Sequence, residues 1–334
     1  MKIYKVGGAV RDEIMGIKPS DSDWVVVGST PKEMISLGYK QVGKDFPVFI
    51  HPETNEEYAL ARTEIKTGKG YSGFTVDFDS SVTLEQDLSR RDLTINSIAM
   101  DMKGNIIDPY NGVQDIKNKC LAHTSDAFFE DPLRSLRLIR FKTKFEDFSI
   151  HKKTLGALNK IKSSNELRYL KAERVYLELE KGFAISATRF LQNIIDFQLI
   201  EPWFTTLSRL PKKVSNDFDI AWCQISSMNN YKFAQTLLLR NTTKKTLDVW
   251  KAMDAYNSND AVEVRANFYL KMTSSQYDQL FIKVLPYFEK SNLNHRSIYE
   301  KIKKVDFSYL SNIKNELIPH EKRLKIIKII EQDE

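Results

Sequence analysis

The spacing of apolar residues changes near residue 115, and this change constrains the fold more than any other feature. Before it, short strand-forming runs such as Ile3–Val6 and Trp24–Val27 end at glycine turns. After it, apolar residues recur at helical steps of three and four, as in Ala172–Gly182 and Lys322–Ile330. The pattern predicts an α+β protein in which a small mixed-sheet head is followed by an all-helical neck, body and tail.

Turn and capping signals predict further elements of the head. Val48–Ile50 and Glu57–Ala61 are expected strands, while Ala9–Met15 and Pro31–Leu37 are expected helices. Thr30, directly before the second of these helices, is typical of an N-cap, and proline suits the first helical position. We expect the helices to cover one face of the sheet.

Charge is distributed unevenly along the 334 residues. Residues 1–113 hold 13 Lys and Arg against 17 Asp and Glu, whereas residues 114–334 hold 37 against 27. A basic remainder behind an acidic head suits a polyanionic partner, although ordinary solvated surface charge explains the asymmetry equally well.

Composition also bears on location. No apolar run approaches the ~18 residues of a membrane span. Two cysteines, Cys120 and Cys223, are too few and too far apart for a disulfide scaffold. We therefore expect a cytoplasmic protein without a membrane partner. The sequence leaves monomer and homodimer open.

Two aspartates stand immediately before an apolar strand. In a strand, the alternation of side chains would place Asp21 and Asp23 on one side, about 6.6 Å apart along the chain. Hard oxygen ligands in this arrangement suit Mg²⁺ that is shared with substrate phosphates. Taken alone, such a pair is more often a turn that precedes a strand.

A glycine turn upstream strengthens this interpretation. Gly7 and Gly8 follow the first expected strand and open the first expected helix. Glycines let the backbone approach a phosphate, and Arg11 can supply a fork of donors one helical turn later. The turn and the aspartates together predict a site for a nucleoside triphosphate and metal ions.

The combined pattern resembles the tRNA nucleotidyltransferase (CCA-adding) and bacterial poly(A) polymerase family, within the polymerase-β-like superfamily, and among its members the class II bacterial enzymes. The motifs that carry the resemblance follow the family's order over residues 1–145: Gly7–Asp12, Asp21–Asp23, Arg90–Asn96, Asp108–Gly112 and Glu130–Phe141. The resemblance implies a nucleotidyltransferase head over residues 1–113, a neck with a base-recognition helix over 114–180, and a tRNA-binding body and tail over 181–334.

The resemblance also implies a reaction and its metal ligands. The 3′ hydroxyl at the tRNA acceptor end would attack the α-phosphorus of CTP or ATP and release pyrophosphate. Asp21 and Asp23 would be the catalytic residues that hold Mg²⁺.

The nucleotide contacts are implied in the same way. Gly8 and Arg11 would contact the triphosphate. Arg91 would contact the phosphates or the sugar, while Asp92 and Asn96 would recognise the ribose.

The resemblance assigns the base edge to Asp131 and Arg134, in place of a nucleic-acid template, and makes Arg137 and Arg140 complete the pocket. On a helix these four residues would each be rotated by about 60° from the one before and would climb about 13.5 Å in all. A carboxylate accepts from the amino group of cytosine or adenine, and a guanidinium donates to the neighbouring ring acceptor. Uracil and guanine present the opposite order, so the pair would select CTP and ATP.

The resemblance leaves several activities open, within the family and outside it. The glycine-rich stretch over residues 66–73 resembles the flexible loop of enzymes that add all of CCA, which favours them over partial enzymes that add only CC. Poly(A) polymerases are less similar, because residues 142–150 look unlike the segment that follows the Glu130–Phe141 motif in them and because Asp108–Gly112 looks closer to the CCA enzymes. A partial enzyme that adds only A stays open. Outside these activities, the sequence also allows a catalytically inactive RNA-binding protein on the same scaffold or a metal-dependent sugar-nucleotide transferase. None of the five histidines is followed by aspartate, so no HD phosphohydrolase domain is expected.

Overall fold

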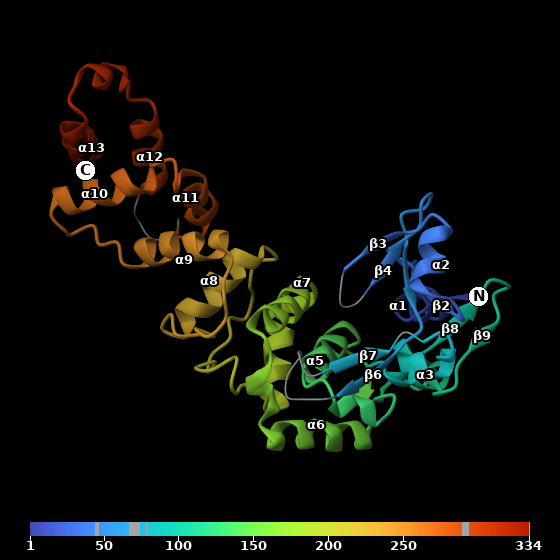
Figure 1. Ribbon diagram of the computed structural model, residues 1–334. Helices are drawn as coiled ribbons and strands as arrows, with labels where there is room; N and C mark the ends of the chain where they lie inside the picture. The colour runs from blue at the N-terminus through green and yellow to red at the C-terminus, as the bar shows by residue number, and fades with distance from the viewer. Residues whose placement is uncertain (44–46, 67–73, 78, 289–293, 334) are drawn as a thin grey trace. The chain divides into compact units, whose positions relative to one another are not determined.

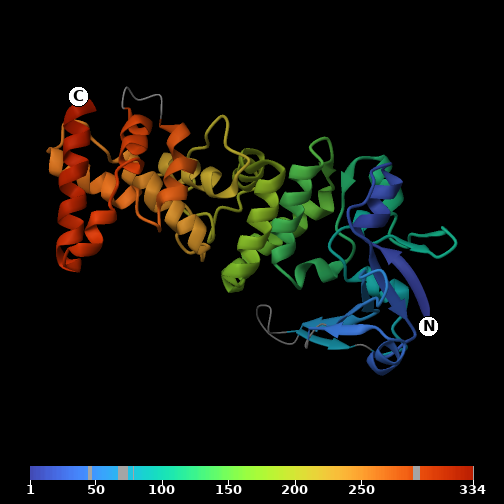
Figure 2. The same ribbon diagram turned by 90° about the horizontal axis from the view of Figure 1, so that it is seen from above.

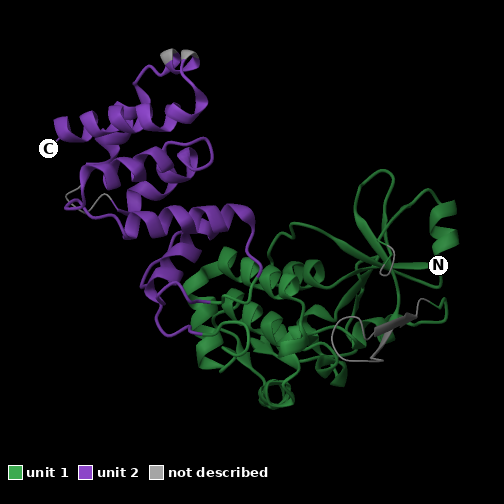
Figure 3. Cartoon of the chain, turned by 60° about the vertical axis from the view of Figure 1, so that its left-hand side comes forward, with its two compact units in different colours: residues 1–205, 234–237 green, residues 206–233, 238–334 purple. Residues whose placement is uncertain are grey.

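The computed structural model describes residues 1–43, 47–66, 74–77, 79–288 and 294–333. The chain divides into two compact units, unit 1 with residues 1–205 and 234–237 and unit 2 with residues 206–233 and 238–334 (Figure 3). The expected domain boundaries at residues 113 and 180 both fall inside unit 1. The division into head, neck and body therefore stays a prediction.

A seven-stranded sheet forms the head of unit 1, in the order β3-β4-β5-β2-β1-β8-β9 (Figure 1). Its strands are β1 (Lys2–Val6), β2 (Asp23–Val27), β3 (Lys40–Val42), β4 (Val48–Ile50), β5 (Glu57–Leu60), β8 (Ala99–Asp101) and β9 (Ile106–Ile107). β2 pairs with β5 in parallel, and the other neighbours pair antiparallel. This confirms the mixed sheet that the strand and turn signals predict.

Helices and short strands make up the rest of unit 1. The helices are α1 (Gly8–Ile14), α2 (Pro31–Ser36), α3 (Leu84–Ser89), α4 (Gly112–Lys117), α5 (Leu133–Lys144), α6 (Lys152–Ser164) and α7 (Ala172–Asp196), with 3₁₀ turns η2 (Thr94–Asn96), η3 (Asp126–Phe129) and η4 (Glu166–Tyr169). The two-stranded pairs are β6 (Thr63–Lys66) with β7 (Phe74–Asp77) and β10 (Cys120–Leu121) with β11 (Ser149–Ile150). The second pair interrupts the helical part, and its two-residue strands are too short to show a period in the sequence.

Apolar side chains cover both faces of the sheet. Val25 of β2 packs in a cluster with Leu88 of α3, whereas Val26 packs in another with Met34 of α2. Because successive residues of a strand point to opposite faces, helices lie against both faces. The expectation that they cover one face is wrong, since β2 is buried on both sides.

Capping residues define the start of α2 as the sequence predicts. The Thr30 hydroxyl accepts from the Glu33 backbone N–H at 3.3 Å, and the Glu33 carboxylate accepts from the Thr30 N–H at 2.9 Å. This reciprocal pair satisfies two of the donors that a helix leaves open at its beginning.

Within the residues that the structure describes, unit 2 consists of helices joined by turns and loops, with no strand. Its helices are α8 (Phe218–Met228), α9 (Asn241–Asp254), α10 (Val262–Met272), α11 (Asp278–Val284), α12 (His295–Lys303) and α13 (Ile318–Asp333), joined by 3₁₀ turns η5 (Leu285–Tyr287), η6 (Ser308–Asn312) and η7 (Asn315–Leu317). A core around Trp250, Tyr269, Phe281 and Ile326 holds these helices together. Across the described part of the chain, no helix has the length and apolar character needed to cross a membrane.

Burial of His295 is expected to make the stability of unit 2 depend on pH. The imidazole is 3% exposed, and its Nδ1 lies 2.7 Å from the Tyr269 hydroxyl. Burial lowers the pKa of His295 to about 4, whereas a histidine in an unfolded chain has a pKa of about 6.5. The unfolded chain therefore binds the proton more tightly. The free energy of unfolding should fall by about 3 kcal/mol as the pH drops from about 6.5 to about 4.

Urea unfolding at several pH values in this window, followed by tryptophan fluorescence, measures the effect. The His295→Phe variant, which has no titrating ring, serves as the control and should show a shallower dependence. An equal slope in both proteins would assign the pH dependence to other groups.

Candidate active site

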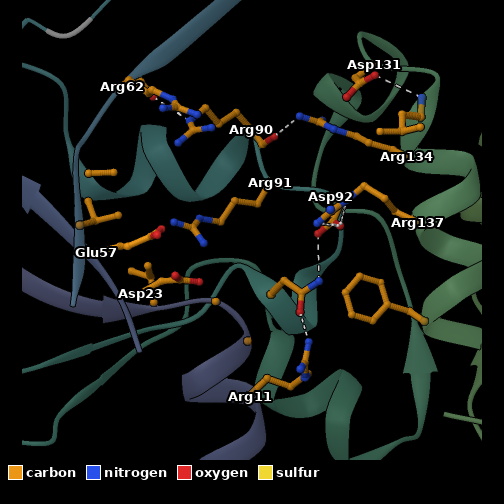
Figure 4. A pocket seen from close by; sticks show the side chains of 18 of the residues that line it. Arg11, Asp23, Glu57, Arg62, Arg90, Arg91, Asp92, Asp131, Arg134 and Arg137 are labelled. Carbon is orange, nitrogen blue, oxygen red and sulfur yellow. Dashed lines mark hydrogen bonds and ion pairs between the residues drawn. The ribbon is translucent and has the colours of Figure 1, made fainter. Parts of the chain in front are cut away.

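A pocket of about 710 Å³ lies within unit 1, between strands β1, β2 and β5, the segment that follows α3, and helix α5 (Figure 4). Its basic lining residues are Arg11, Arg62, Arg90, Arg91, Arg134, Arg137, Arg140, Lys144 and Arg174. Its acidic lining residues are Asp23, Glu57, Asp92 and Asp131. The lining therefore carries a surplus of positive charge, which suits an anionic ligand.

Two carboxylates on neighbouring strands form one wall of this pocket. Asp23 begins β2, Glu57 begins β5, and the parallel register places these two residues opposite each other. Both are exposed, and neither side chain forms an ion pair or hydrogen bond within the described residues. Glu57 was not among the predicted site residues, although its position at the start of an expected strand was a signal for it.

Asp21 lies outside the strand that was expected to align it with Asp23. β2 begins at Asp23, so the alternation of strand side chains does not extend to Asp21. Asp21 is exposed, accepts a hydrogen bond from the Ser20 hydroxyl at 2.9 Å, and is not among the residues that line the pocket. The expectation that both side chains lie on one side of the same strand is therefore wrong. The metal-binding role of both residues stays a prediction.

The glycine turn between β1 and α1 brings the backbone to the pocket. Gly7 has a φ of 73°, and a Cβ at this position would lie 2.9 Å from Nη1 of Arg91. A side chain at Gly7 would therefore strain the backbone and displace an arginine of the pocket. Gly8, the expected triphosphate contact, is the first residue of α1 and lines the same pocket.

A chain of hydrogen bonds links α1 to α5 through the 3₁₀ turn η2 (Figure 4). Nη1 of Arg11 donates to Oδ1 of Asn96 at 2.5 Å, and Nδ2 of Asn96 donates to Oδ1 of Asp92 at 3.0 Å. Nε of Arg137 donates to the other oxygen of Asp92 at 2.8 Å. Four residues with implied nucleotide roles therefore also hold one another in place.

Asp92 is ionised despite its burial. Desolvation, the largest influence, would raise the pKa of Asp92, but the Arg137 guanidinium and the Asn96 amide outweigh it and lower the pKa to about 2. Asp92 in turn raises the pKa of Arg137. The pair is therefore fully charged at neutral pH.

A second buried carboxylate, Asp87 of α3, holds two arginines of the pocket. Asp87 is 0% exposed, and its oxygens accept from Nη2 of Arg90 at 2.5 Å and from Nη2 of Arg91 at 3.1 Å. Burial would raise the pKa of Asp87 most strongly, but the two guanidinium groups outweigh it and lower the pKa. Asp87 could not be predicted as a site residue from the sequence, because basic residues three and four positions later are common on any helical surface.

Helix α5 carries the arginine row, but it begins later than expected. Its first residue is Leu133, so Asp131 lies in the preceding turn and not on the helix as the sequence analysis assumed. Pro132 is the N-cap residue and bounds the helix there. Arg134 donates to the backbone oxygens of Ala127 and Arg90, and lines the pocket together with Arg137 and Arg140.

The apolar residues between the arginines of α5 are buried, which is usual for a helix that is apolar on several sides. Leu133, Leu136, Leu138, Ile139 and Phe141 are all at most 5% exposed. α5 is therefore a buried helix and not a charged helix that faces solvent.

Helix α7 supplies two charged residues that sequence reasoning missed. α5 and α7 lie side by side (Figures 1 and 2). Glu178, 3% exposed, accepts from Nε of Arg140 at 2.6 Å and lies 3.5 Å from Nη1 of Arg137. One turn earlier, Arg174 contacts the carboxylate of Asp131. No local pattern connects these partners, which lie about forty residues apart in the chain.

The structure brings together all but one of the site residues that the sequence analysis names. Gly8, Arg11, Asp23, Arg91, Asp92, Asn96, Asp131, Arg134, Arg137 and Arg140 line one pocket, and Asp21 lies outside its lining. The expected loop at residues 66–73 falls, apart from Lys66, outside the described residues. Within the described residues, no group of three or more His, Cys, Asp or Glu side chains forms a metal cluster.

Known proteins resemble this chain in sequence. Residues 3–122 match the family described as the poly A polymerase head domain. The CCA-adding enzyme of Actinobacillus succinogenes is 47% identical over 260 residues, which are 77% of this chain and 60% of that protein. The multifunctional CCA protein of Methylobacillus flagellatus is 59% identical over 182 residues, or 54% of this chain and 44% of that one. The matched region thus spans only 44–60% of the length of these relatives.

Solved structures share the fold. The Bacillus stearothermophilus CCA-adding enzyme in complex with CTP matches with a TM-score of 0.65 at 19% identity, over 99% of this chain and 89% of that one. The Thermotoga maritima CCA-adding enzyme complexed with tRNA matches with a TM-score of 0.58 at 21% identity, over 99% and 90%. The sequence match of the head and the relatives above show that the chain belongs to the tRNA nucleotidyltransferase and poly(A) polymerase family.

Proposed function

We propose that this chain is a CCA-adding tRNA nucleotidyltransferase, which joins CTP and ATP to tRNA 3′ ends without a template, releases pyrophosphate and repairs damaged ends. The observation that carries the proposal is the charge of the pocket, with nine Arg and Lys against four Asp and Glu in its lining. Guanidinium groups bind phosphate oxygens in a fork, so this lining suits a triphosphate. The relatives named CCA-adding enzyme support the same activity.

The arginines and the glycine turn would bind and orient the triphosphate. Gly8 allows close approach of the phosphates to the backbone, while Arg11 and Arg91 supply donors from two sides of the pocket. Asn96 and Asp92 would fix the position of the ribose. Nδ2 of Asn96 already donates a hydrogen bond to Oδ1 of Asp92 at 3.0 Å. This arrangement would hold the α-phosphorus in place for attack by the tRNA hydroxyl.

The carboxylates at the strand edge fit a divalent cation. Asp23 and Glu57 share a wall of a pocket with nine basic residues, yet within the described chain neither carboxylate pairs with any of them. Free carboxylate oxygens on a pocket wall are the donors that Mg²⁺ prefers. We therefore assign Asp23 and Glu57 as the pocket residues that would hold Mg²⁺. Asp21, outside the pocket lining, is kept as a further ligand because the resemblance implies it. When bound there, Mg²⁺ would supply activation of the 3′ hydroxyl and neutralise charge on the leaving pyrophosphate.

Asp131 and Arg134 would select the base. The Arg134 side chain is anchored on two backbone oxygens, and Asp131 lies in the turn just before its helix. A wrong base would leave buried donors and acceptors of this pair unmatched, which is a strong basis for rejection.

The basic part of the chain would bind the acceptor end of tRNA. Residues 114–334 carry 37 Lys and Arg against 27 Asp and Glu. Such a surplus favours contacts to RNA phosphates and 2′ hydroxyls, which recognise shape more than sequence. The Thermotoga maritima enzyme that shares this fold is complexed with tRNA.

The compartment that fits this function is the cytoplasm. Both cysteines, Cys120 and Cys223, are free thiols, as is usual for proteins of a reducing compartment.

A direct assay tests the proposed function. The chain is incubated with Mg²⁺ and tRNA that lacks its 3′ CCA, together with each labelled nucleotide alone or with CTP and ATP combined. We expect two C residues from CTP alone and the complete CCA from both, with little product from UTP or GTP.

The same assay separates the competing activities. A long A tract would indicate a poly(A) polymerase, and extension that stops after CC, or that adds only A to tRNA ending in CC, would indicate a partial enzyme. Binding of tRNA without incorporation would indicate an inactive RNA-binding protein. A product on a sugar acceptor and none on tRNA would indicate a sugar-nucleotide transferase.

A further inference from the structure

Arg174 forms a two-pronged contact with the carboxylate that is expected to select the base. Nη1 of Arg174 donates to Oδ1 of Asp131 at 3.2 Å, and Nη2 donates to Oδ2 at 2.8 Å. Two parallel bonds fix both the position and the rotation of a carboxylate, which a single bond does not. Arg174 also lines the pocket itself.

Counting the acceptors of Asp131 shows what this contact leaves for a ligand. Oδ1 accepts from the Leu133 backbone N–H at 3.2 Å as well as from Arg174, so both of its lone pairs are used. Oδ2 accepts only from Arg174 among the described residues. One acceptor position on Oδ2 therefore remains for a base.

The two halves of the base-reading pair are anchored by different elements. Arg134 is held by the backbone oxygens of Ala127 in η3 and of Arg90. Asp131 precedes α5, and the side chain that orients it comes from α7. Loss of Arg174 would therefore leave the carboxylate held only by the Leu133 backbone N–H, while the guanidinium of Arg134 stays in place.

We propose that Arg174 is a positioning residue that determines nucleotide specificity by presenting a single acceptor of Asp131 to the base. The inference rests on the proposed function. With Asp131 held in the fork, an amino group of cytosine or adenine finds an acceptor, whereas a carbonyl oxygen of uracil or guanine faces a second acceptor. A carboxylate held only by the Leu133 N–H could turn about that single hydrogen bond, and would lose part of this discrimination.

A purely structural role for Arg174 makes a different prediction. The Arg174 and Asp131 side chains are 23% and 18% exposed, and ion pairs that contact water contribute little to stability. α5 and α7 are also joined by the Arg140–Glu178 ion pair. Removal of Arg174 should therefore change the choice of nucleotide much more than the unfolding midpoint.

The test compares kcat/KM for CTP and UTP on tRNA that lacks CCA. We expect the CTP preference to fall about tenfold or more in Arg174→Ala, and by less in Arg174→Lys, whose ammonium keeps the charge without the fork. Arg189→Ala is the matched control, because it removes an exposed arginine of the same helix that pairs with Glu146 outside the pocket lining. The control should keep the preference of the unchanged chain.

Two further measurements make the result decisive. In an Asp131→Ala background, Arg174→Ala should cause no additional loss of preference, because the carboxylate that it positions is gone. If Arg174→Ala is too slow for kinetics, the ratio of CTP to UTP dissociation constants is measured by calorimetry.

An unchanged CTP-to-UTP ratio in a folded variant would overturn the inference, and a weaker preference for CTP would support it. Failure of the unchanged chain to incorporate any nucleotide would instead refute the proposed function, and the binding ratio would still test Arg174.

Discussion

Replacement of Asp23 by alanine is expected to reduce nucleotide incorporation by on the order of 10³-fold while leaving tRNA affinity nearly unchanged. Asp23 begins β2 on the pocket wall, opposite Glu57 of β5. Among the described residues, no Lys or Arg side chain forms an ion pair with its carboxylate. Loss of this oxygen donor would remove a metal ligand at the position where charge develops during the reaction. Single-turnover incorporation of labelled CTP and filter binding of tRNA measure the two quantities separately.

Glu53→Ala is the matched control for this variant. Glu53 is an exposed carboxylate in the turn between β4 and β5, and it is not among the residues that line the pocket. Its removal changes the net charge of the head by the same amount and should leave incorporation intact. Normal incorporation by Asp23→Ala would refute the metal assignment, and an equal loss in both variants would point to a general charge effect.

Replacement of Gly112 by alanine is expected to lower the free energy of unfolding by about 3 kcal/mol. A Cβ at Gly112 would lie 2.2 Å from the backbone oxygen of Thr94 and 2.8 Å from the Ile98 side chain. Backbone atoms cannot rotate away as a side chain does, so α4 would have to separate from η2. Because η2 also carries Asn96, nucleotide affinity should fall together with stability.

Gly156→Ala is the comparison variant, in which the same substitution is expected to raise the free energy of unfolding. Gly156 lies inside α6, and an added Cβ would meet no atom within 4 Å. Alanine has a higher helix propensity than glycine, so this variant should gain up to about 1 kcal/mol. Parallel urea titrations of both variants measure the difference. Similar unfolding midpoints would mean that the contact between Gly112 and Thr94 relaxes at little cost.

Motif Asp108–Gly112 illustrates how a resemblance in sequence acquires a physical reason in the structure. The Asp108 carboxylate accepts from the backbone N–H groups of Gly112 and Val113, both at 2.8 Å, and so caps the beginning of α4. Gly112 then permits the close approach to Thr94. The motif was recognised from its residues alone, but its role in supporting η2 follows from contacts that no spacing rule describes.

The sequence was sufficient wherever structure depends on neighbours along the chain. β4 is observed at the expected residues, while β1, β2 and β5, together with helices α1 and α2, lie within one residue of their expected bounds, and Thr30 caps α2 as expected. These features depend on side-chain period, on capping and on turn preferences, which act over a few residues. Asp131 shows the limit of such rules, because the start of α5 was expected two residues too early.

Tertiary structure alone decided which distant residues share the pocket. The pairing of β2 with β5 places Glu57 beside Asp23, and the packing of α7 on α5 brings Arg174 to Asp131, forty-three residues away. Asp87 shows that tertiary structure also matters for partners close in the chain. Its spacing to Arg90 and Arg91 is common on helix surfaces, and only its burial in the fold makes it a fixed partner of both arginines. Local periodicity carries no information about partners from other elements. The carboxylates and arginines were therefore visible in the sequence, whereas the groups that orient them were visible only in the fold.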